Sequence, residues 1–202
     1  MNLCKLCFCD IEISGINSLR KTAEICQKCY NKFDVIFLSS FINGIKVLSL
    51  YEYDQVMMKL LYQFKACYDI DLKNIFVQRH LFELKIKYKN FIIVPIPSTK
   101  SSDENRGFNH VEEMFSLLGI PIYPLVKKKV NFKQSDLSRE ERLKAKNKFE
   151  IIDGEILTNK KVLIVDDVIT TGASFNAVVE LIKKYKPKRV EGLTICKKCR
   201  KT

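Results

Sequence analysis

Residues 162–174 carry the pattern with the clearest chemistry. An apolar run ends in two carboxylates, Asp166 and Asp167, and the next residues form a loop of hydroxyl side chains around one glycine. Backbone N–H groups and hydroxyls at the start of a helix bind phosphate. Paired carboxylates repel phosphate and bind sugar hydroxyls or Mg²⁺ instead. The segment therefore predicts a site for a sugar 5-phosphate.

The loop that would face the phosphate consists of Thr170, Thr171, Gly172, Ala173 and Ser174. Its glycine can adopt a positive φ or let the backbone approach a ligand closely. An acidic pair alone is more often a solvated strand end or a helix-capping turn. The adjoining threonine-glycine loop favours a ligand site over that alternative.

Two cysteine pairs near the N-terminus have the spacing of a metal site. Cys4 and Cys7, and then Cys26 and Cys29, are each separated by two residues, and 18 residues lie between the pairs. Two such turns can present four thiolates to one tetrahedral ion, which predicts structural zinc with no open position for catalysis. The alternatives are incidental cysteines or a redox pair, and Cys9 could replace Cys7 as a ligand.

Three further cysteines have weaker interpretations. Cys196 and Cys199 form a third pair without a fourth, which favours an inert basic tail over a ligand-exchange partner or a separate redox couple. Cys67 is most simply a small buried residue.

The elements that must position these residues follow from hydrophobic periodicity and turn residues. Strands are expected at residues 45–53, 91–96, 122–126, 161–165 and 189–196. Helices are expected at residues 54–67, 72–88, 111–118, 138–146 and 174–185. Strands that alternate with helices predict an α/β fold, with a largely parallel sheet flanked by helices. Ligands of such sheets bind beyond the carboxyl ends of the strands.

The net charge of +12 comes from two short segments. Residues 127–148 hold nine basic and three acidic side chains, and residues 183–202 hold nine basic and one acidic. The segment between them, with the sugar-phosphate motif, is acidic. The two segments therefore predict contact with a polyanion larger than one phosphate, for which DNA is the better candidate. The alternative is a solvated surface that keeps the protein soluble.

Composition and missing motifs narrow the class of protein further. The 202 residues fit one domain with an appendage or two small domains, and 47% hydrophobic content supports a folded core. Residues 35–45 form the most apolar run and are too short to span a membrane, and residues 1–10 lack the pattern of a secretory signal. A cytoplasmic location is therefore expected.

The sequence lacks the motifs that define several other enzyme classes. The chain has no nucleotide-binding glycine motif and no serine nucleophile motif. Its two histidines offer a hydrolase few candidates. His80 is expected to be a packed or surface residue, and His110 adjoins the predicted site without an evident acidic partner.

Three segments and the cysteine pairs together resemble the ComF family of competence-associated proteins. Residues 162–174 resemble the phosphoribosyl pyrophosphate signature of type I phosphoribosyltransferases. Residues 94–97 with 106–109 resemble a second family motif, and residues 133–142 resemble the family's variable loop. The resemblance implies a zinc ribbon or knuckle at residues 1–40 and a type I phosphoribosyltransferase-like domain at residues 41–202.

The resemblance also implies roles for individual residues. Asp166 and Asp167 would hold the ribose hydroxyls with Mg²⁺, and residues 170–174 would hold the 5-phosphate of phosphoribosyl pyrophosphate or a nucleotide. Lys100 and Arg106 remain to meet a diphosphate, because residues 98–105 lack the several basic side chains of the family. Weak neutralisation of the diphosphate favours ligand binding over transfer. An active phosphoribosyltransferase is the alternative.

At the level of the cell, the resemblance implies an accessory of natural transformation. It would help single-stranded DNA past the membrane beside a competence helicase, in the cytoplasm or peripherally at the DNA-uptake machinery. Phe132 and Tyr185 could stack on bases. A third hypothesis is a non-catalytic adaptor whose zinc module docks a partner protein.

Overall fold

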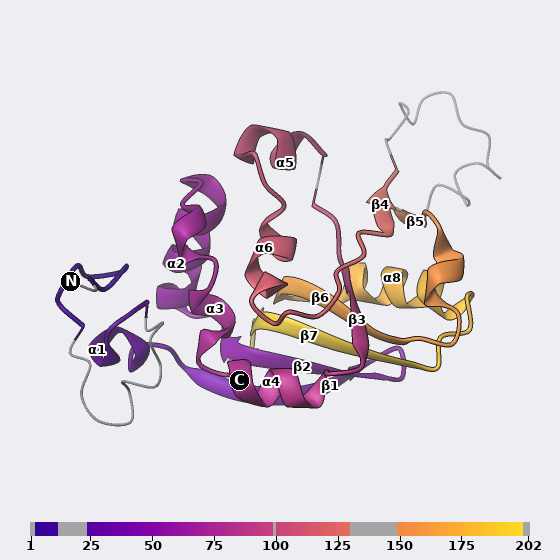
Figure 1. Cartoon of the computed structure of the whole chain (residues 1–202), viewed down its shortest axis with the longest axis horizontal. Helices are drawn as coiled ribbons and strands as arrows, with labels where there is room; N and C mark the ends of the chain where they lie inside the picture. The colour runs from indigo at the N-terminus through magenta and orange to yellow at the C-terminus, as the bar shows by residue number, and fades with distance from the viewer. Residues whose placement is uncertain (1–2, 12–23, 99, 130–148, 200–202) are drawn as a thin grey trace.

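The computed structural model describes residues 3–11, 24–98, 100–129 and 149–199. Its main body is a five-stranded sheet in the order β1-β2-β7-β6-β3 (Figure 1). The parallel strands are β2 (Ile45–Glu52), β7 (Arg189–Lys197), β6 (Lys161–Ile169) and β3 (Phe91–Pro95). An antiparallel edge strand, β1 (Val35–Ile42), pairs with β2. The expected parallel α/β sheet is confirmed.

Helices and a small second sheet complete the described structure. The helices are α1 (Gln27–Tyr30), α2 (Gln55–Ala66), α3 (Ile75–Gln78), α4 (Leu81–Lys87), α5 (Lys100–Arg106), α6 (His110–Ser116) and α8 (Ala173–Lys183). Two 3-10 turns lie at Ile70–Leu72 and Gly154–Leu157, and β4 (Val126–Lys128) pairs with β5 (Phe149–Ile151). No helix in the described ranges is long and apolar enough to cross a bilayer.

Side chains of β6 alternate between two cores, as the period of a strand requires. Leu163 and Val165 belong to the buried cluster that contains residues of α2, α3 and α6. Val162 and Ile164 belong to a second cluster with residues of α8. The continuous apolar run of β6 is thus buried on both faces. Its carboxyl end is a firmly anchored place for functional residues.

The cysteine module packs against the main body. Cys4, Cys26 and Phe33 share a buried cluster with Tyr51 of β2. β1 leads from the module into the main sheet and crosses the boundary expected at residue 40. A division into two domains there stays a prediction.

Two expected elements differ from the structure. The helix expected at residues 72–88 is broken into α3 and α4, since His80 leaves helical geometry at φ −109° and packs its ring against Phe37 and Tyr51. In the strand expected at residues 122–126, Ile122 makes only an isolated bridge, and the paired strand is β4. The helix expected at residues 138–146 lies outside the described residues.

Two cysteines also differ from expectation. Cys67 caps the end of α2 and is exposed, so its assignment as a buried residue is wrong. Cys196 is fully buried in β7, where burial raises the pKa of its thiol. Cys196 therefore belongs to β7, the last strand in the sequence and the central strand of the sheet. Cys199 follows this strand.

Candidate functional site

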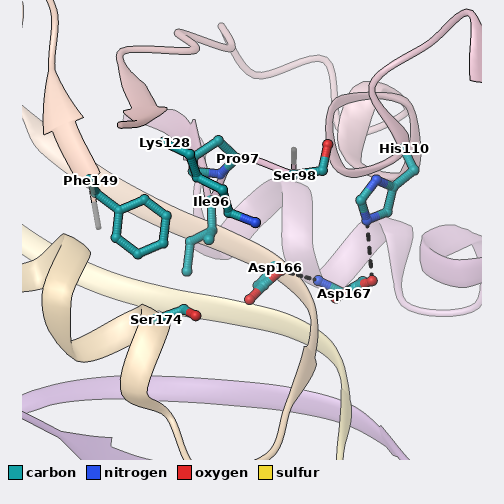
Figure 2. Close-up of a pocket in the computed structure, with 9 residues that line it drawn as sticks. All are labelled: Ile96, Pro97, Ser98, His110, Lys128, Phe149, Asp166, Asp167 and Ser174. Carbon is teal, nitrogen blue, oxygen red and sulfur yellow. Dashed lines mark hydrogen bonds and ion pairs between the residues drawn. The ribbon is translucent and has the colours of Figure 1, made fainter. Parts of the chain in front are cut away.

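The site forms where β6 extends beyond β3. Pro95, the last residue of β3, pairs with Val165, whereas Asp166 and the residues after it pair only with β7 among the described strands. The side of β6 next to β3 is therefore open from Asp166 onward. A cavity of about 220 Å³ occupies this place, at the edge of the sheet where ligands of parallel sheets bind (Figure 2).

Six separate stretches of the chain line this cavity. Its lining residues are Ile96, Pro97, Ser98, His110, Lys128, Phe149, Asp166, Asp167 and Ser174. Figure 2 shows Lys128 and Phe149 opposite the acidic pair, on the β4-β5 side of the cavity. Lys128 is the one cation among the described residues that line it. The cavity thus joins the end of β6 to the small second sheet.

A second hollow, of about 70 Å³, lies beside the first and is lined by the hydroxyl-rich loop. All five residues of the predicted phosphate loop, 170–174, line it together with Asp166. Gly172 has a φ of +75° at the start of α8, as predicted. A Cβ on this glycine would lie 2.9 Å from Cδ1 of Ile42, so the loop is closely packed against β1. Asp166 is shared by both hollows.

The two carboxylates of the acidic pair have different surroundings. Asp167 is buried and forms an ion pair with Lys65 of α2. Its Oδ2 also lies 3.2 Å from Nε2 of His110, and its Oδ1 accepts a hydrogen bond from the Val168 amide at 2.6 Å. Asp166 accepts a hydrogen bond from the Asp167 amide at 2.9 Å. The carboxylate of Asp167 is therefore held by the protein, and that of Asp166 faces both hollows.

Burial is the main cause of shifted pKa values at three side chains of the site, Asp166, Lys65 and His110. Burial raises the pKa of Asp166 to about 7, and the positive charges of Lys65 and Lys128 oppose this rise. Burial lowers the pKa of Lys65 to about 8, which the charge of Asp166 opposes. Burial, together with three nearby cations, lowers the pKa of His110 to about 3, so its imidazole is neutral at neutral pH. The site therefore combines a neutral imidazole with a carboxyl that titrates near pH 7.

Of the two residues expected on the diphosphate side, Arg106 is turned inward. Its Nε donates to the main-chain oxygen of Lys65 at 3.0 Å, and its Nη1 lies 3.2 Å from Asp103. The guanidinium also lies over the ring of Phe108, and its side chain is only 8% exposed. Lys100 begins α5, and its side chain lies outside what the structure describes. Their contact with a diphosphate stays a prediction.

Three features of the site were not predicted from the sequence. Lys65 lies four residues after Leu61, on the stripe of α2 that packs into the core, and this placement was the one signal for its burial. Lys128 belongs to a basic segment whose composition predicts only a surface for a polyanion. His110 does have an acidic partner, Asp167, which corrects the expectation that it had none.

The N-terminal thiols gather around one point. The sulfurs of Cys4, Cys7, Cys9 and Cys26 all lie within 4.8 Å of one another. Cys29 is also buried, and burial together with the nearby thiols of Cys7, Cys26 and Cys4 raises the pKa of its own thiol. The four thiols that lie within 4.8 Å of one another could hold a metal ion, and they include three of the four predicted ligands with Cys9 as the fourth. Cys29 as a ligand stays a prediction.

Comparison with known proteins defines the class of this chain first. A family model described as a phosphoribosyl transferase domain matches residues 71–202. Purine phosphoribosyltransferase from Pyrococcus horikoshii is 26% identical, over 59% of this chain and 71% of that one, with a TM-score of 0.35. Adenine phosphoribosyltransferase from Saccharomyces cerevisiae is 18% identical, over 85% and 86%, with a TM-score of 0.40. These TM-scores are too low to bear on the fold, and the class rests on the family model.

Two curated relatives then give the particular family. Competence protein ComFC of Streptococcus pneumoniae is 32% identical over 152 residues, which are 75% of this chain and 68% of that protein. Competence protein ComFC of Bacillus subtilis is 30% identical over 151 residues, 73% of this chain and 62% of that protein. The chain belongs to the ComFC-type competence proteins of the ComF family, with a phosphoribosyl transferase domain and an N-terminal cysteine cluster.

Proposed function

We propose that the paired hollows at the end of β6 bind phosphoribosyl pyrophosphate or a nucleotide. The observation that supports this most is the shared position of Asp166, which lines both hollows. A ribose placed at this carboxylate can extend its 5-phosphate into the loop of residues 170–174. Its 1-substituent then extends into the larger cavity. Asp167 would support the ribose side from its fixed position.

Magnesium suits this site chemically. Oxygen ligands are what Mg²⁺ prefers, and Asp166 offers a carboxylate that faces the cavity. When bound, the ion would neutralise part of the charge of a diphosphate. The guanidinium of Arg106 is engaged within the protein, which favours ligand binding over group transfer.

Calorimetry with phosphoribosyl pyrophosphate and Mg²⁺ tests the ligand. We expect saturable binding that Asp166→Asn abolishes. Asp34→Asn is the matched control, because Asp34 is an exposed carboxylate outside both hollows and should leave the isotherm unchanged. An Asp166→Asn isotherm equal to that of the wild type would refute the site.

We propose that zinc occupies the cysteine cluster. Four sulfurs within 4.8 Å of one another match the donor set of a structural zinc site, and Cys29 stands beside them as the remaining predicted ligand. Bound zinc would hold the N-terminal turns together. Metal analysis of the purified protein should find one equivalent of zinc, and Cys26→Ser should lose it.

We also propose that the protein handles single-stranded DNA during natural transformation. Part of the excess positive charge lies where the parallel strands β6 and β7 begin. The two hollows lie toward the opposite ends of these strands. Lys161 and Arg189 pair in register where β6 and β7 begin. Beside them, the backbone N–H of Lys188 donates a hydrogen bond to the backbone carbonyl of Lys160. The exposed cations at this end include Lys160, Lys186, Lys188 and Arg189. We name these four residues the basic end.

The site for DNA can be tested with charge-neutral variants. Replacing Lys186, Lys188 and Arg189 by Gln should weaken binding of a single-stranded oligonucleotide at low salt. The matched control neutralises Lys183 and Lys184 at the end of α8, which belong to the same basic segment but not to the basic end. Undetectable DNA binding by the wild type at low salt would refute the proposal. Phe132 lies outside the described residues, and Tyr185 packs partly against a core cluster.

The cellular role proposed is that of a cytoplasmic accessory that works beside a competence helicase, at the membrane DNA-uptake machinery. The family supports the link to competence, and the helicase is the partner proposed for the cysteine module. Co-purification with the helicase should survive Asp166→Asn and fail for Cys26→Ser. A Cys26→Ser protein that stays folded and still binds the helicase would exclude the module as the docking surface.

A further inference from the structure

The histidine at the start of α6 bridges a guanidinium and a carboxylate. Nη1 of Arg106 lies 3.0 Å from Nδ1 of His110, and Nε2 of His110 lies 3.2 Å from Oδ2 of Asp167. A guanidinium can only donate hydrogen bonds, so Nδ1 must accept and carries no proton. A carboxylate at this distance accepts, so Nε2 must donate. The two neighbours together select one tautomer.

We propose that His110 is a positioning residue, an uncharged imidazole with its proton on Nε2 that ties Asp167 to Arg106 and so sets the geometry of the acidic pair. This inference rests on the proposed function for its effect on ligand binding. It rests on the hydrogen-bond partners alone for the tautomer. Nothing in the family comparison assigns His110 such a role.

The surroundings of the imidazole disfavour a charge on it. Lys65 of α2, Arg106 of α5 and Lys128 of β4 are the cations near it, and Asp167 of β6 is its one acidic contact among the described residues. Asp167 already forms an ion pair with Lys65. A proton on Nδ1 would point an N–H group at the N–H of Arg106. The buried position of His110 would leave that clash unscreened.

The bridge has a rigid far end. Arg106 is fixed by Asp103, by the main-chain oxygen of Lys65 and by the ring of Phe108. Through His110 this corner of α2 and α5 is linked to the carboxyl end of β6. Asp167 then has two donors on Oδ2 and one on Oδ1, which leaves its carboxylate no freedom to rotate. Asp166 precedes Asp167 in the continuous strand β6, so fixing Asp167 also holds the part of the strand from which Asp166 lines both hollows.

A glutamine can supply the same two hydrogen bonds. Its amide nitrogen would donate to Asp167, and its amide oxygen would accept from Arg106. Leucine has a similar size and offers neither bond. His110→Gln and His110→Leu therefore separate the hydrogen-bond bridge from simple filling of space.

Long-range ¹H–¹⁵N NMR of the imidazole rings in the free, full-length protein tests the tautomer. The chain has only two histidines, so the spectrum of His110→Gln assigns both rings. We expect His110 at neutral pH to show a protonated Nε2 and an unprotonated Nδ1. A ring protonated on Nδ1, or on both nitrogens, would overturn the inference whatever the protein binds.

Binding of phosphoribosyl pyrophosphate with Mg²⁺ tests the positioning role. Loss of a hydrogen bond to a charged group typically changes an equilibrium by about 10-fold or more, so His110→Leu should weaken binding by about that factor. His110→Gln should restore most of the affinity. The control is His80→Gln, because His80 packs on Phe37 and Tyr51, outside both hollows.

The outcomes separate this inference from the proposed function. Equal losses for His110→Gln and His110→Leu would overturn the bridge while the ligand site stands. A wild-type protein that binds no phosphoribosyl pyrophosphate would overturn the proposed ligand instead. In that case the tautomer, and greater thermal stability of His110→Gln than of His110→Leu, still decide whether the bridge exists.

Discussion

Two adjacent aspartates in this protein have unlike surroundings. Asp167 is paired with Lys65 and His110, whereas Asp166 faces the open hollows. The sequence predicts that both carboxylates lie at the end of a strand. It does not predict their difference, because Lys65 reaches the pair from a helix about a hundred residues earlier in the chain. Side chains that arrive from distant elements leave no local pattern.

The raised pKa of Asp166 predicts a pH effect on stability. Its pKa is about 7 when folded and about 3.8 when unfolded, so the folded protein binds more protons between these values. The contribution of Asp166 to stability is therefore lost as pH rises from about 4 to 7. Asp166→Asn does not titrate, so its stability relative to wild type should be greater at pH 7 than at pH 4. Chemical denaturation of both proteins at the two pH values measures this difference.

Asp34→Asn serves as the control for this titration, because it removes an exposed carboxylate. The opposite effect of His110, whose pKa is lowered, is present in both proteins and cancels in the comparison. A difference between wild type and Asp166→Asn that is the same at pH 4 and pH 7 would show that Asp166 has an ordinary pKa.

Lys65 should stabilise the fold through Asp167. Lys65→Met keeps the length of the side chain and leaves a buried carboxylate without its cation. Because the Lys65 side chain is 29% exposed, we expect a loss of about 1 to 3 kcal/mol, less than for a fully buried pair. Urea denaturation measures it. The double variant with Asp167→Asn should recover part of the loss, and fully additive losses would show that the two residues do not interact.

At the scale of elements, the apolar strands were predictable and the interrupted helix was not. β3 and β6 lie in the sheet with both faces covered, so their sequences contain continuous apolar runs. The break between α3 and α4 depends on the ring of His80, which packs against side chains of β1 and β2. β1 itself is an edge strand with mostly exposed residues, and its sequence lacks regular alternation. Tertiary packing decided both features.

The joint between β6 and α8 should be sensitive to one methyl group. Gly172→Ala places a Cβ at positive φ and within 2.9 Å of Ile42, which should cost about 1 to 3 kcal/mol of stability. The same change should weaken binding of phosphoribosyl pyrophosphate by shifting the loop. Gly119→Ala is the control, because Gly119 has a φ of +66° and no atom within 4 Å of its Cβ position. Equal losses for both variants in thermal unfolding would exclude the contact with Ile42.

At the scale of the whole molecule, the cysteine module and the sheet share one core. Cys4 and Cys26 lie in the same buried cluster as Leu50 and Tyr51 of β2. Lys5 adds an ion pair with Glu24 and a hydrogen bond to the main chain near α3. Removal of the proposed zinc with a chelator should therefore lower the melting temperature of the whole protein in a single transition. Two separate transitions in calorimetry would show that the module unfolds by itself.

The positive charge is also organised over the whole molecule. The sequence predicts two basic segments, but only the structure shows that cations of the two segments lie at different places in the fold. Lys128 lines the larger hollow, whereas Lys186, Lys188 and Arg189 lie toward the amino end of the sheet. The sheet runs between these places, because β6 begins beside Arg189 and carries the acidic pair in its carboxyl-terminal half. The proposed small-ligand site and the basic end therefore do not overlap.

This separation predicts that single-stranded DNA and phosphoribosyl pyrophosphate bind at the same time. Fluorescence anisotropy of a labelled oligonucleotide should not change when phosphoribosyl pyrophosphate and Mg²⁺ saturate the hollows. Each cation that neutralises a phosphate adds about 0.7 to the salt dependence of single-strand binding, so replacing three cations of the basic end should lower that slope by about 2. Neutralising Lys127 and Lys128 should leave the salt dependence of DNA binding unchanged. It should weaken the binding of phosphoribosyl pyrophosphate. Displacement of DNA by phosphoribosyl pyrophosphate would instead place DNA over the hollows, where the cations of β4 would bind both.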